Sequence, residues 1–214
     1  MSADSSFTAT FSQALRGGAC YVLGLHPDPA EVPTGRWSAA ADDEDRAILD
    51  LCCGPTLDIG CGPGRMAAAL AERGQVVLGI DVVPEAVDQT NRRGASALRR
   101  DVFGVLPAEG RWHTALLADG NIGIGGDPLA LLGRVGELLA GEGRIVVEVA
   151  EPGVASRAVW AVLDCEGRRS RPFRWAVVGV DDIADLAARV GLVLDPLHRV
   201  GARWCAVLHK GESR

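Results

Sequence analysis

The sequence has no hydrophobic run that approaches the ~20 consecutive apolar residues of a membrane-spanning helix. Its first residues, Met-Ser-Ala-Asp-Ser-Ser, form neither a basic nor an apolar segment, so we expect no secretion signal. Hydrophobic residues nevertheless make up 48% of the 214 positions, too many for a disordered chain. This length suits one α/β domain with a sizeable core, and we expect a cytoplasmic protein without a membrane partner.

Basic residues are few: 22 Lys and Arg stand against 28 Asp and Glu, and the net charge is −6. A nucleic-acid-binding protein needs a basic face to neutralise phosphates, so this balance argues against a nucleic-acid partner. Lys210 is the only lysine, and this preference for Arg, with abundant Ala and Gly, is typical of a GC-rich bacterial genome. The composition favours a small-molecule substrate, in a monomer or a homodimer.

Metal-binding patterns are also missing. The six cysteines show no C-x-x-C pair and no other metal-ligand spacing, so we expect no metal site. Together with the lack of a secretion signal, this favours reduced thiols in a cytosolic protein. The cysteines are Cys20, Cys52, Cys53, Cys61, Cys165 and Cys205.

The most informative stretch is residues 56–65, TLDIGCGPGR, an apolar strand followed by three alternate glycines and then a helix over 66–73. Glycines at a strand-to-helix turn let a ligand approach the backbone closely, and the helix start offers unpaired N–H groups. The next strand ends in Asp81, about 20 residues on, where doubly wound folds place a carboxylate against ribose hydroxyls. The pattern predicts an adenosine-bearing cofactor.

Arg65 separates two candidate cofactors. The dinucleotide fingerprint G-x-G-x-x-G/A ends in a small residue that lets helix and strand pack closely around a pyrophosphate, and Arg65 occupies that position here. Asp58, before the first glycine, adds a negative charge that opposes phosphates and suits an ammonium or sulfonium. An NAD-dependent oxidoreductase is therefore the less favoured alternative.

The motif LDIGCGPGR followed by LGID resembles the class I S-adenosylmethionine-dependent methyltransferases. The resemblance covers about residues 43–210 and implies S-adenosylmethionine as cofactor and S-adenosylhomocysteine as product. It also implies a set of residues that contact the cofactor along the ends of the first four core strands. These are Asp58, Gly60, Cys61, Gly62, Asp81, Val82, Asp101, Val102, Asp119 and Gly120.

The order of elements implies an α/β fold: a doubly wound, seven-stranded mixed sheet, parallel with an antiparallel terminal strand, and helices on both faces. Strands are expected at the start of 56–65 and over 75–81, 95–99, 112–118, 144–149, 192–200 and 203–208. Helices are expected over 7–15, 46–52, 66–73, 85–93, 129–139 and 181–190. The whole chain, 1–214, is expected to be a single methyltransferase domain, with an N-terminal lid (1–41), a cofactor-binding core (42–150), an inserted hairpin on the substrate side (151–180), and a last helix with closing strands (181–214).

Three residues are candidates for catalysis. Asp119 and Asn121 follow the fourth core strand, where the family places residues beside the transferred methyl group. The alternative is that Asp119 caps the turn and Asn121 adopts a left-handed conformation. His26, in the lid, is a possible base, whereas His113 lies at the far end of its strand and is expected to be structural.

Trp37, Arg36 and Arg174 are candidates for the substrate side, because they lie in the lid and in the inserted hairpin. Their alternatives are a tryptophan that fills the edge of the core and arginines that are simply solvated. The leading hypothesis is a small-molecule methyltransferase, and the expected setting is a bacterial secondary pathway. The other alternative is a protein that binds S-adenosylmethionine without methyl transfer, and the sequence does not name the acceptor.

Overall fold

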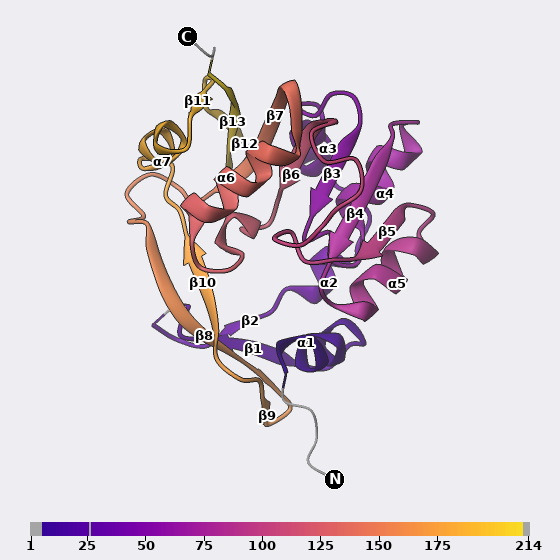
Figure 1. The fold of residues 1–214 in the computed structure, drawn as a ribbon. Coiled ribbons are helices and arrows are strands. Elements are labelled where there is room, and N and C mark those ends of the chain that lie inside the picture. The colour runs from indigo at the N-terminus through magenta and orange to yellow at the C-terminus, as the bar shows by residue number, and fades with distance from the viewer. Residues whose placement is uncertain (1–5, 26, 212–214) are drawn as a thin grey trace.

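The computed structural model of the chain describes residues 6–25 and 27–211, which form two β-sheets with helices around the larger one (Figure 1). His26, one of the catalytic candidates, lies outside the described residues. No helix in the described ranges has the length and apolar character needed to cross a membrane.

The larger sheet contains the cofactor motif. Its strands are β3 (Thr56–Ile59), β4 (Val77–Asp81), β5 (Ser96–Arg99), β6 (Trp112–Leu117), β7 (Leu139–Val149), β11 (Leu192–Leu194), β12 (His198–Val200) and β13 (Arg203–Lys210). The order is β11-β13-β7-β6-β3-β4-β5, with β12 beside β13. Strands β3 to β7 pair in parallel and β13 runs antiparallel to β7, which confirms the predicted doubly wound mixed sheet.

The chain moves outward from β3 through β4 to β5 and then returns to β6 on the other side of β3. The strand order therefore reverses between β3 and β6, and ligands bind beyond the carboxyl ends of the strands at such a point. One expected strand was wrong in detail: residues 192–200 form two short strands, β11 and β12, rather than one. Pro196 lies between them and has no N–H to donate to a ladder.

Helices cover both faces of this sheet. Helices α3 (Asp43–Leu49) and α4 (Arg65–Glu72) pack on one face, with α5 (Pro84–Arg92) beside α4, and α6 (Pro128–Leu138) and α7 (Ile183–Arg189) pack on the other (Figure 1). The alternation of side chains along β6 explains this: Leu116 packs among residues of α3 and α4, and Leu117 among residues of α6. The core thus holds the ends of β3, β4 and β6 in fixed positions.

The smaller sheet joins the N-terminal segment to the segment between β7 and α7. Its strands are β1 (Cys20–Leu23), β2 (Ala30–Glu31), β8 (Arg157–Cys165), β9 (Arg168–Arg169) and β10 (Phe173–Val177), in the order β10-β8-β1-β2 with β9 beside β8. The inserted hairpin was predicted, but its antiparallel pairing with the N-terminal segment was not. The N-terminal segment and the hairpin therefore form one antiparallel β-sheet.

Helix α1 (Phe7–Leu15) attaches this smaller sheet to the core. Leu15 packs against Val83 and Ala86 at the start of α5. The Gln89 side-chain amide donates a hydrogen bond to the Leu15 carbonyl at 2.9 Å, and Arg16 pairs with Glu85 at 2.9 Å. The predicted helix over 7–15 is confirmed, and its contacts place the lid directly against α5.

The expectation that all six cysteines are reduced was wrong for one pair. Cys20 and Cys165 form a disulfide, because the register of β1 and β8 places them opposite each other with Cα atoms 4.1 Å apart. They are 145 residues apart in sequence, so no local spacing indicated the bond. The cytoplasmic location inferred from reduced thiols loses that support, since disulfides are uncommon in the cytosol.

Candidate active site

A cavity of about 880 Å³ lies between the carboxyl ends of β3, β4 and β6 and the inner side of the smaller sheet. This volume is within the range of small-molecule and cofactor sites, and the position is the one that the strand order indicates. The first wall of the cavity is formed by the predicted cofactor motif and the ends of these strands. The second wall is formed by the lid and the hairpin.

The glycine turn after β3 forms part of the first wall of the cavity. Gly60, Gly62 and Gly64 have φ angles of +72°, +54° and +86°, a backbone region that other residues rarely adopt. A Cβ atom at Gly62 would meet nothing within 4 Å, whereas one at Gly60 would lie 2.8 Å from the Asn121 amide nitrogen. The turn therefore leaves open backbone facing the cavity at Gly62 and allows close packing at Gly60.

Asp81, at the end of β4, lines the cavity and is held by the backbone. One carboxylate oxygen accepts a hydrogen bond from the Gly62 N–H at 3.0 Å, and the other accepts one from the Val83 N–H at 2.8 Å. Burial raises the pKa of Asp81 in spite of these bonds. Each oxygen keeps a lone pair, so the fixed carboxylate can accept from two neighbouring hydroxyls of a ribose.

Asp58, on β3, is a buried acid with an unpaired oxygen. Its side chain is 2% exposed, and its Oδ2 has no hydrogen-bond partner among the described residues. Burial, and then the nearby charge of Asp119, raises the pKa of Asp58 to about 7. A buried carboxylate is costly unless a cation or donor binds it, so this oxygen is suited to an ammonium group in the cavity.

The remaining predicted cofactor residues divide between the cavity and its surroundings. Asp101 and Val102 lie beyond β5 and line the cavity, and Asp101 also accepts a hydrogen bond from the Phe103 N–H at 3.0 Å. Val82 and Cys61 line it as well, and burial raises the pKa of the Cys61 thiol well above its usual value. Gly120 supports the turn with φ +80° but is not a lining residue.

Asp119 and Asn121 follow β6 and both line the cavity. Asp119, not Asn121, has the left-handed conformation, with φ +52°. The Asn121 amide donates to the carbonyls of Ile59 and Gly60, each at 2.9 Å, and so holds the loop after β6 against the glycine turn. Its Oδ1 has no hydrogen-bond partner in the described part of the chain.

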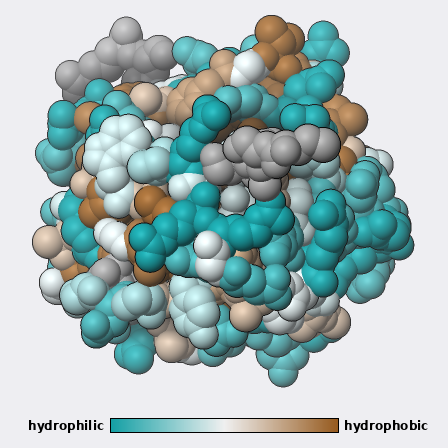
Figure 2. Space-filling model, turned by 90° about the horizontal axis from the view of Figure 1, so that it is seen from below, coloured by the Kyte–Doolittle hydropathy of each residue, from teal (hydrophilic) through white to brown (hydrophobic). Residues whose placement is uncertain are grey.

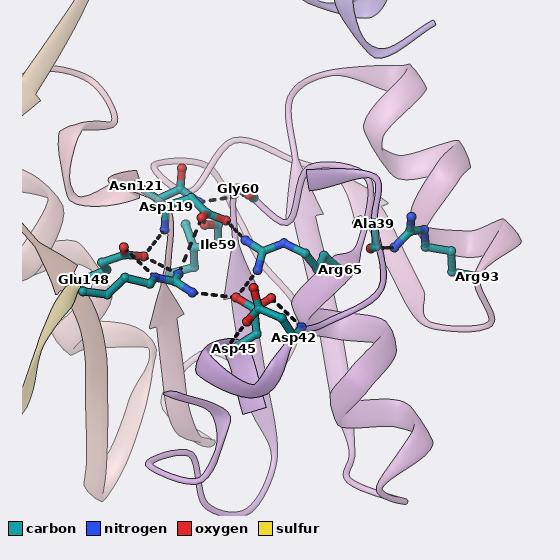
Figure 3. A network of polar contacts seen from close by, with 11 residues as sticks. Ala39, Asp42, Asp45, Ile59, Gly60, Arg65, Arg93, Asp119, Asn121 and Glu148 are labelled. Atoms are coloured by element: carbon teal, nitrogen blue, oxygen red, sulfur yellow. Dashed lines mark hydrogen bonds and ion pairs between the residues drawn. The ribbon is translucent and has the colours of Figure 1, made fainter. Parts of the chain in front are cut away.

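A buried ionic network that the sequence did not indicate fixes Asp119 (Figure 3). Arg65 contacts Asp119 at 2.5 Å and also pairs with Asp45. Arg203 donates a hydrogen bond to the Asp45 carboxylate at 2.6 Å. Two of its nitrogens donate to the Glu148 carboxylate, at 2.9 and 2.6 Å. Glu148 in turn accepts from the Asp119 N–H at 2.7 Å.

Charge balance within this network determines the ionisation of its acids. Burial would raise the pKa of Asp45, but hydrogen bonds from Arg65 and Arg203 outweigh it and lower the pKa to about 2. Asp119 behaves differently: burial raises its pKa although Arg65 and Arg203 oppose the shift. Arg65, which the sequence offered only as a departure from the dinucleotide fingerprint, lines the cavity but is 3% exposed, and its guanidinium group pairs with Asp45 and Asp119.

The substrate-side candidates have different positions. Trp37, at the end of the short helix α2 (Thr34–Trp37), lines the cavity. Arg174 on β10 also lines it and lies over the ring of Trp160, with its guanidinium carbon 5.9 Å from the ring centroid. Arg36 is exposed and is not a lining residue.

Aromatic residues of the second wall were mostly missed. The chain has four Phe, five Trp and one Tyr, and six of these line the cavity. Only Trp37 was named as a candidate, although the i, i+4 spacing of Phe7 and Phe11 and the alternation of Phe173 and Trp175 carried the signal. The six are Phe7, Phe11, Trp37, Trp160, Phe173 and Trp175.

Comparisons with known proteins agree with this geometry. Residues 56–111 match the family described as "Methyltransferase domain". A search among curated proteins found no match. The fold is similar to that of a SAM-dependent methyltransferase from Bacteroides fragilis, solved with S-adenosyl-L-homocysteine, at 21% identity and a TM-score of 0.79 over 97% of this chain and 95% of that one.

Two further solved structures share the fold over a smaller part of the chain. The CcbJ methyltransferase from Streptomyces caelestis has 17% identity and a TM-score of 0.63 over 82% of this chain and 92% of its own. The 1,6-didemethyltoxoflavin-N1-methyltransferase from Burkholderia thailandensis has 21% identity and a TM-score of 0.60 over 83% of each chain. Identities at this level establish a common fold.

Proposed function

From a chain that carries a methyltransferase domain and the fold of SAM-dependent methyltransferases, we propose an enzyme that methylates a small-molecule acceptor with S-adenosylmethionine. The observation that carries the proposal is the unpaired, buried carboxylate oxygen of Asp58 beside the open glycine turn. The negative charge of this carboxylate suits the positively charged groups of S-adenosylmethionine.

The residues of the first wall fit this cofactor group by group. Asp81 would accept from the two ribose hydroxyls, and Asp58 would pair with the ammonium of the methionine part. Asp101 and the backbone of Val102 would lie at the adenine. The open backbone at Gly62 leaves room for the chain between these groups.

A dinucleotide fits less well. Its pyrophosphate would lie at the glycine turn beside the carboxylates of Asp58 and Asp81, which repel it. Arg65, the nearest base in sequence, is already bound to Asp45 and Asp119. These contacts favour a cationic cofactor over NAD.

Bound S-adenosylmethionine would supply a methyl group that is already activated by its sulfonium. The chain's own part is to hold the acceptor in line with that methyl group, to exclude water, and to place negative charge near it. Asp119 lies in the loop after β6 and lines the cavity, so it can place negative charge near the methyl group. Its carboxylate is held in one position by Arg65 and Arg203. We assign Asp119 as the group that accepts a hydrogen bond from the acceptor.

Asn121 is assigned a positioning role, because its amide is committed to the glycine turn. His26 stays a candidate base that the described residues do not test. Bacterial secondary metabolism is proposed as the setting, supported by the Arg-rich composition and by the Burkholderia enzyme, which was solved with 1,6-didemethyltoxoflavin bound. Either a monomer or a homodimer agrees with the fold.

The test is to incubate the protein with S-adenosylmethionine and a panel of small acceptors and to measure S-adenosylhomocysteine by mass spectrometry. Turnover that is lost in Asp58→Asn supports the proposal. Cofactor binding without turnover on any acceptor would favour the alternative of a binding protein that does not methylate. Reduction of NAD with a substrate, and no binding of S-adenosylmethionine, would favour the oxidoreductase.

A further inference from the structure

The second wall of the cavity is a continuous series of aromatic rings. Phe7 and Phe11 on α1 stack with centroids 5.4 Å apart, and Phe11 lies 6.0 Å from Trp37. In the other direction, Phe7 meets Phe173 edge-on at 4.7 Å, and Phe173 meets Trp175 at 6.3 Å. Three separate segments thus contribute to one aromatic surface, which favours a ligand with an aromatic face of its own.

Charge is scarce on this wall. Among the described lining residues from the lid and the hairpin, only Glu31 and Arg174 are charged, and Arg174 is engaged with Trp160. The opposite wall carries the four carboxylates of Asp58, Asp81, Asp101 and Asp119 against two arginines, Arg65 and Arg100, and Arg65 is already paired with Asp45 and Asp119. Carboxylates thus outnumber guanidinium groups among the described lining residues, so the cavity disfavours a ligand with an anionic group.

The five rings of this series, from Trp37 to Trp175, are half-buried around the cavity, whereas Trp160 is 65% exposed. Seen from the side of the smaller sheet and α1, the molecule is mainly hydrophilic, and hydrophobic residues occur in small separate groups (Figure 2). Tyr21, on β1, is 44% exposed and does not line the cavity. The ring surface therefore faces the cavity.

Close packing connects the ring surface to the loop that carries Asp119. Ile124, just after that loop, forms a bridge with Trp175 on β10. A Cβ atom at Gly123 would lie 2.2 Å from the Ala176 carbonyl and 2.4 Å from Trp175 Nε1, so the loop and β10 touch backbone to backbone. Trp175 therefore adjoins the segment that directly follows Asp119 and Asn121, and all three line the same cavity.

We infer that the acceptor is a planar heteroaromatic amine without an anionic group, bound against the rings of Phe11, Phe173 and Trp175. The inference rests on the proposed methyltransferase function and names its substrate class. The described lining side chains include no His, Lys or Tyr, and Asp119 and the Asn121 Oδ1 are hydrogen-bond acceptors that suit an N–H. A ring amine is unprotonated at neutral pH, so no base has to remove a proton from its nitrogen before it reacts.

The transfer balances without a further reactant. The lone pair of the acceptor nitrogen forms the new N–C bond while the C–S bond breaks and its electron pair stays on sulfur. The nitrogen gains the positive charge that the sulfonium loses. Its N–H proton then passes to water, with Asp119 accepting the hydrogen bond until the proton leaves.

The experiment compares three matched probes: 3-aminoquinoline, the saturated amine cyclohexylamine, and the anion quinoline-3-carboxylate. Each is titrated into the protein saturated with S-adenosylhomocysteine, and each amine is also tested for methylation with S-adenosylmethionine. We expect 3-aminoquinoline to bind and the other two to bind at least tenfold more weakly or not at all.

Variants then test the ring surface. Phe11→Leu and Phe173→Leu keep apolar volume but remove a ring face, and each should weaken binding of 3-aminoquinoline about 3- to 10-fold. Tyr21→Leu, on the same sheet but outside the cavity, is the matched control and should leave it unchanged. Affinity for S-adenosylhomocysteine should not change in any of the three.

The outcomes separate the two claims. Equal or tighter binding of cyclohexylamine or quinoline-3-carboxylate, with normal binding of S-adenosylhomocysteine, would overturn the substrate class and leave the methyltransferase proposal standing. Unchanged 3-aminoquinoline affinity in both Phe→Leu variants would also overturn it. Failure to bind S-adenosylhomocysteine at all would remove the proposed function and this inference with it.

Discussion

Asp58 holds a carboxylate where burial opposes its ionisation. Its pKa is raised to about 7, from 3.8, by burial and then by the charge of Asp119. The folded state therefore binds this proton more tightly than the unfolded state, and the contribution of Asp58 to stability falls as pH rises from about 4 to about 7. A cationic ligand that pairs with Asp58 in the cavity recovers this cost.

Cofactor binding should therefore depend on pH. We expect S-adenosylhomocysteine to bind about tenfold more weakly at pH 5.5 than at pH 7.5, because Asp58 must be ionised to pair with the ammonium. Titration calorimetry at the two pH values measures this. 5′-Methylthioadenosine, which has the same nucleoside but no ammonium, is the matched control. An equal pH dependence for both ligands, or one that persists in Asp58→Asn, would contradict the pairing.

Arg65 has a structural role as the cation between two buried carboxylates. It joins Asp45 on α3 to Asp119 after β6, and its removal would leave two buried carboxylates with less compensation. Because the folded pKa of Asp45 is about 2, against 3.8 ordinarily, its contribution to stability is complete above about pH 4 and is lost as pH falls through 2.

We expect Arg65→Met to lower the free energy of unfolding at pH 7 by about 3 kcal/mol, the scale for a broken buried ion pair. The control is Arg73→Met at the end of the same helix, where an exposed pair with Asp50 should contribute under about 1 kcal/mol. Urea denaturation of both variants measures the difference. A loss in Arg65→Met as small as that expected for Arg73→Met, under about 1 kcal/mol, would mean that the buried network does not stabilise the fold.

At the scale of elements, the local parts of the chain were the predictable ones. The strand–glycine–helix unit of β3 and α4 follows from a short motif, and the helices expected over 85–93 and 129–139 are found as α5 and α6, each beginning one residue earlier. The pairing of β1 with β8 was not predictable in this way, because Cys20 and Cys165 are 145 residues apart and a local pattern does not indicate which distant strand will be the partner. The Cys20–Cys165 bond was missed for the same reason.

The disulfide joins the lid to the hairpin, so breaking it should loosen that sheet. We expect Cys20→Ser/Cys165→Ser to lower the free energy of unfolding by about 3 kcal/mol and to weaken acceptor binding, with little effect on S-adenosylhomocysteine. Thermal unfolding with and without dithiothreitol measures the first effect. Cys53→Ser, which changes an exposed free thiol, is the control. A wild-type protein that dithiothreitol does not destabilise would show that the bond contributes nothing.

At the scale of the whole molecule, the sequence predicted one half of the site and missed the other. The doubly wound sheet and the cofactor wall follow from the order of elements and from the motif around Gly60, since these depend on neighbours in sequence. The aromatic wall and the Asp45–Arg203 pair, 158 residues apart, depend on how distant segments meet. Burial and charge pairing across such distances become visible only in three dimensions.

The proposed roles of Asp119 and of the aromatic wall both depend on the identity of the cofactor. The most direct measurement is titration calorimetry of the protein with S-adenosylmethionine, S-adenosylhomocysteine and NAD, repeated with Asp81→Ala. We predict binding of the two sulfur compounds and not of NAD, and a loss of about 1–3 kcal/mol in Asp81→Ala, the scale of charge-assisted hydrogen bonds in a buried site. Binding of NAD alone, or unchanged affinity in Asp81→Ala, would contradict the cofactor assignment.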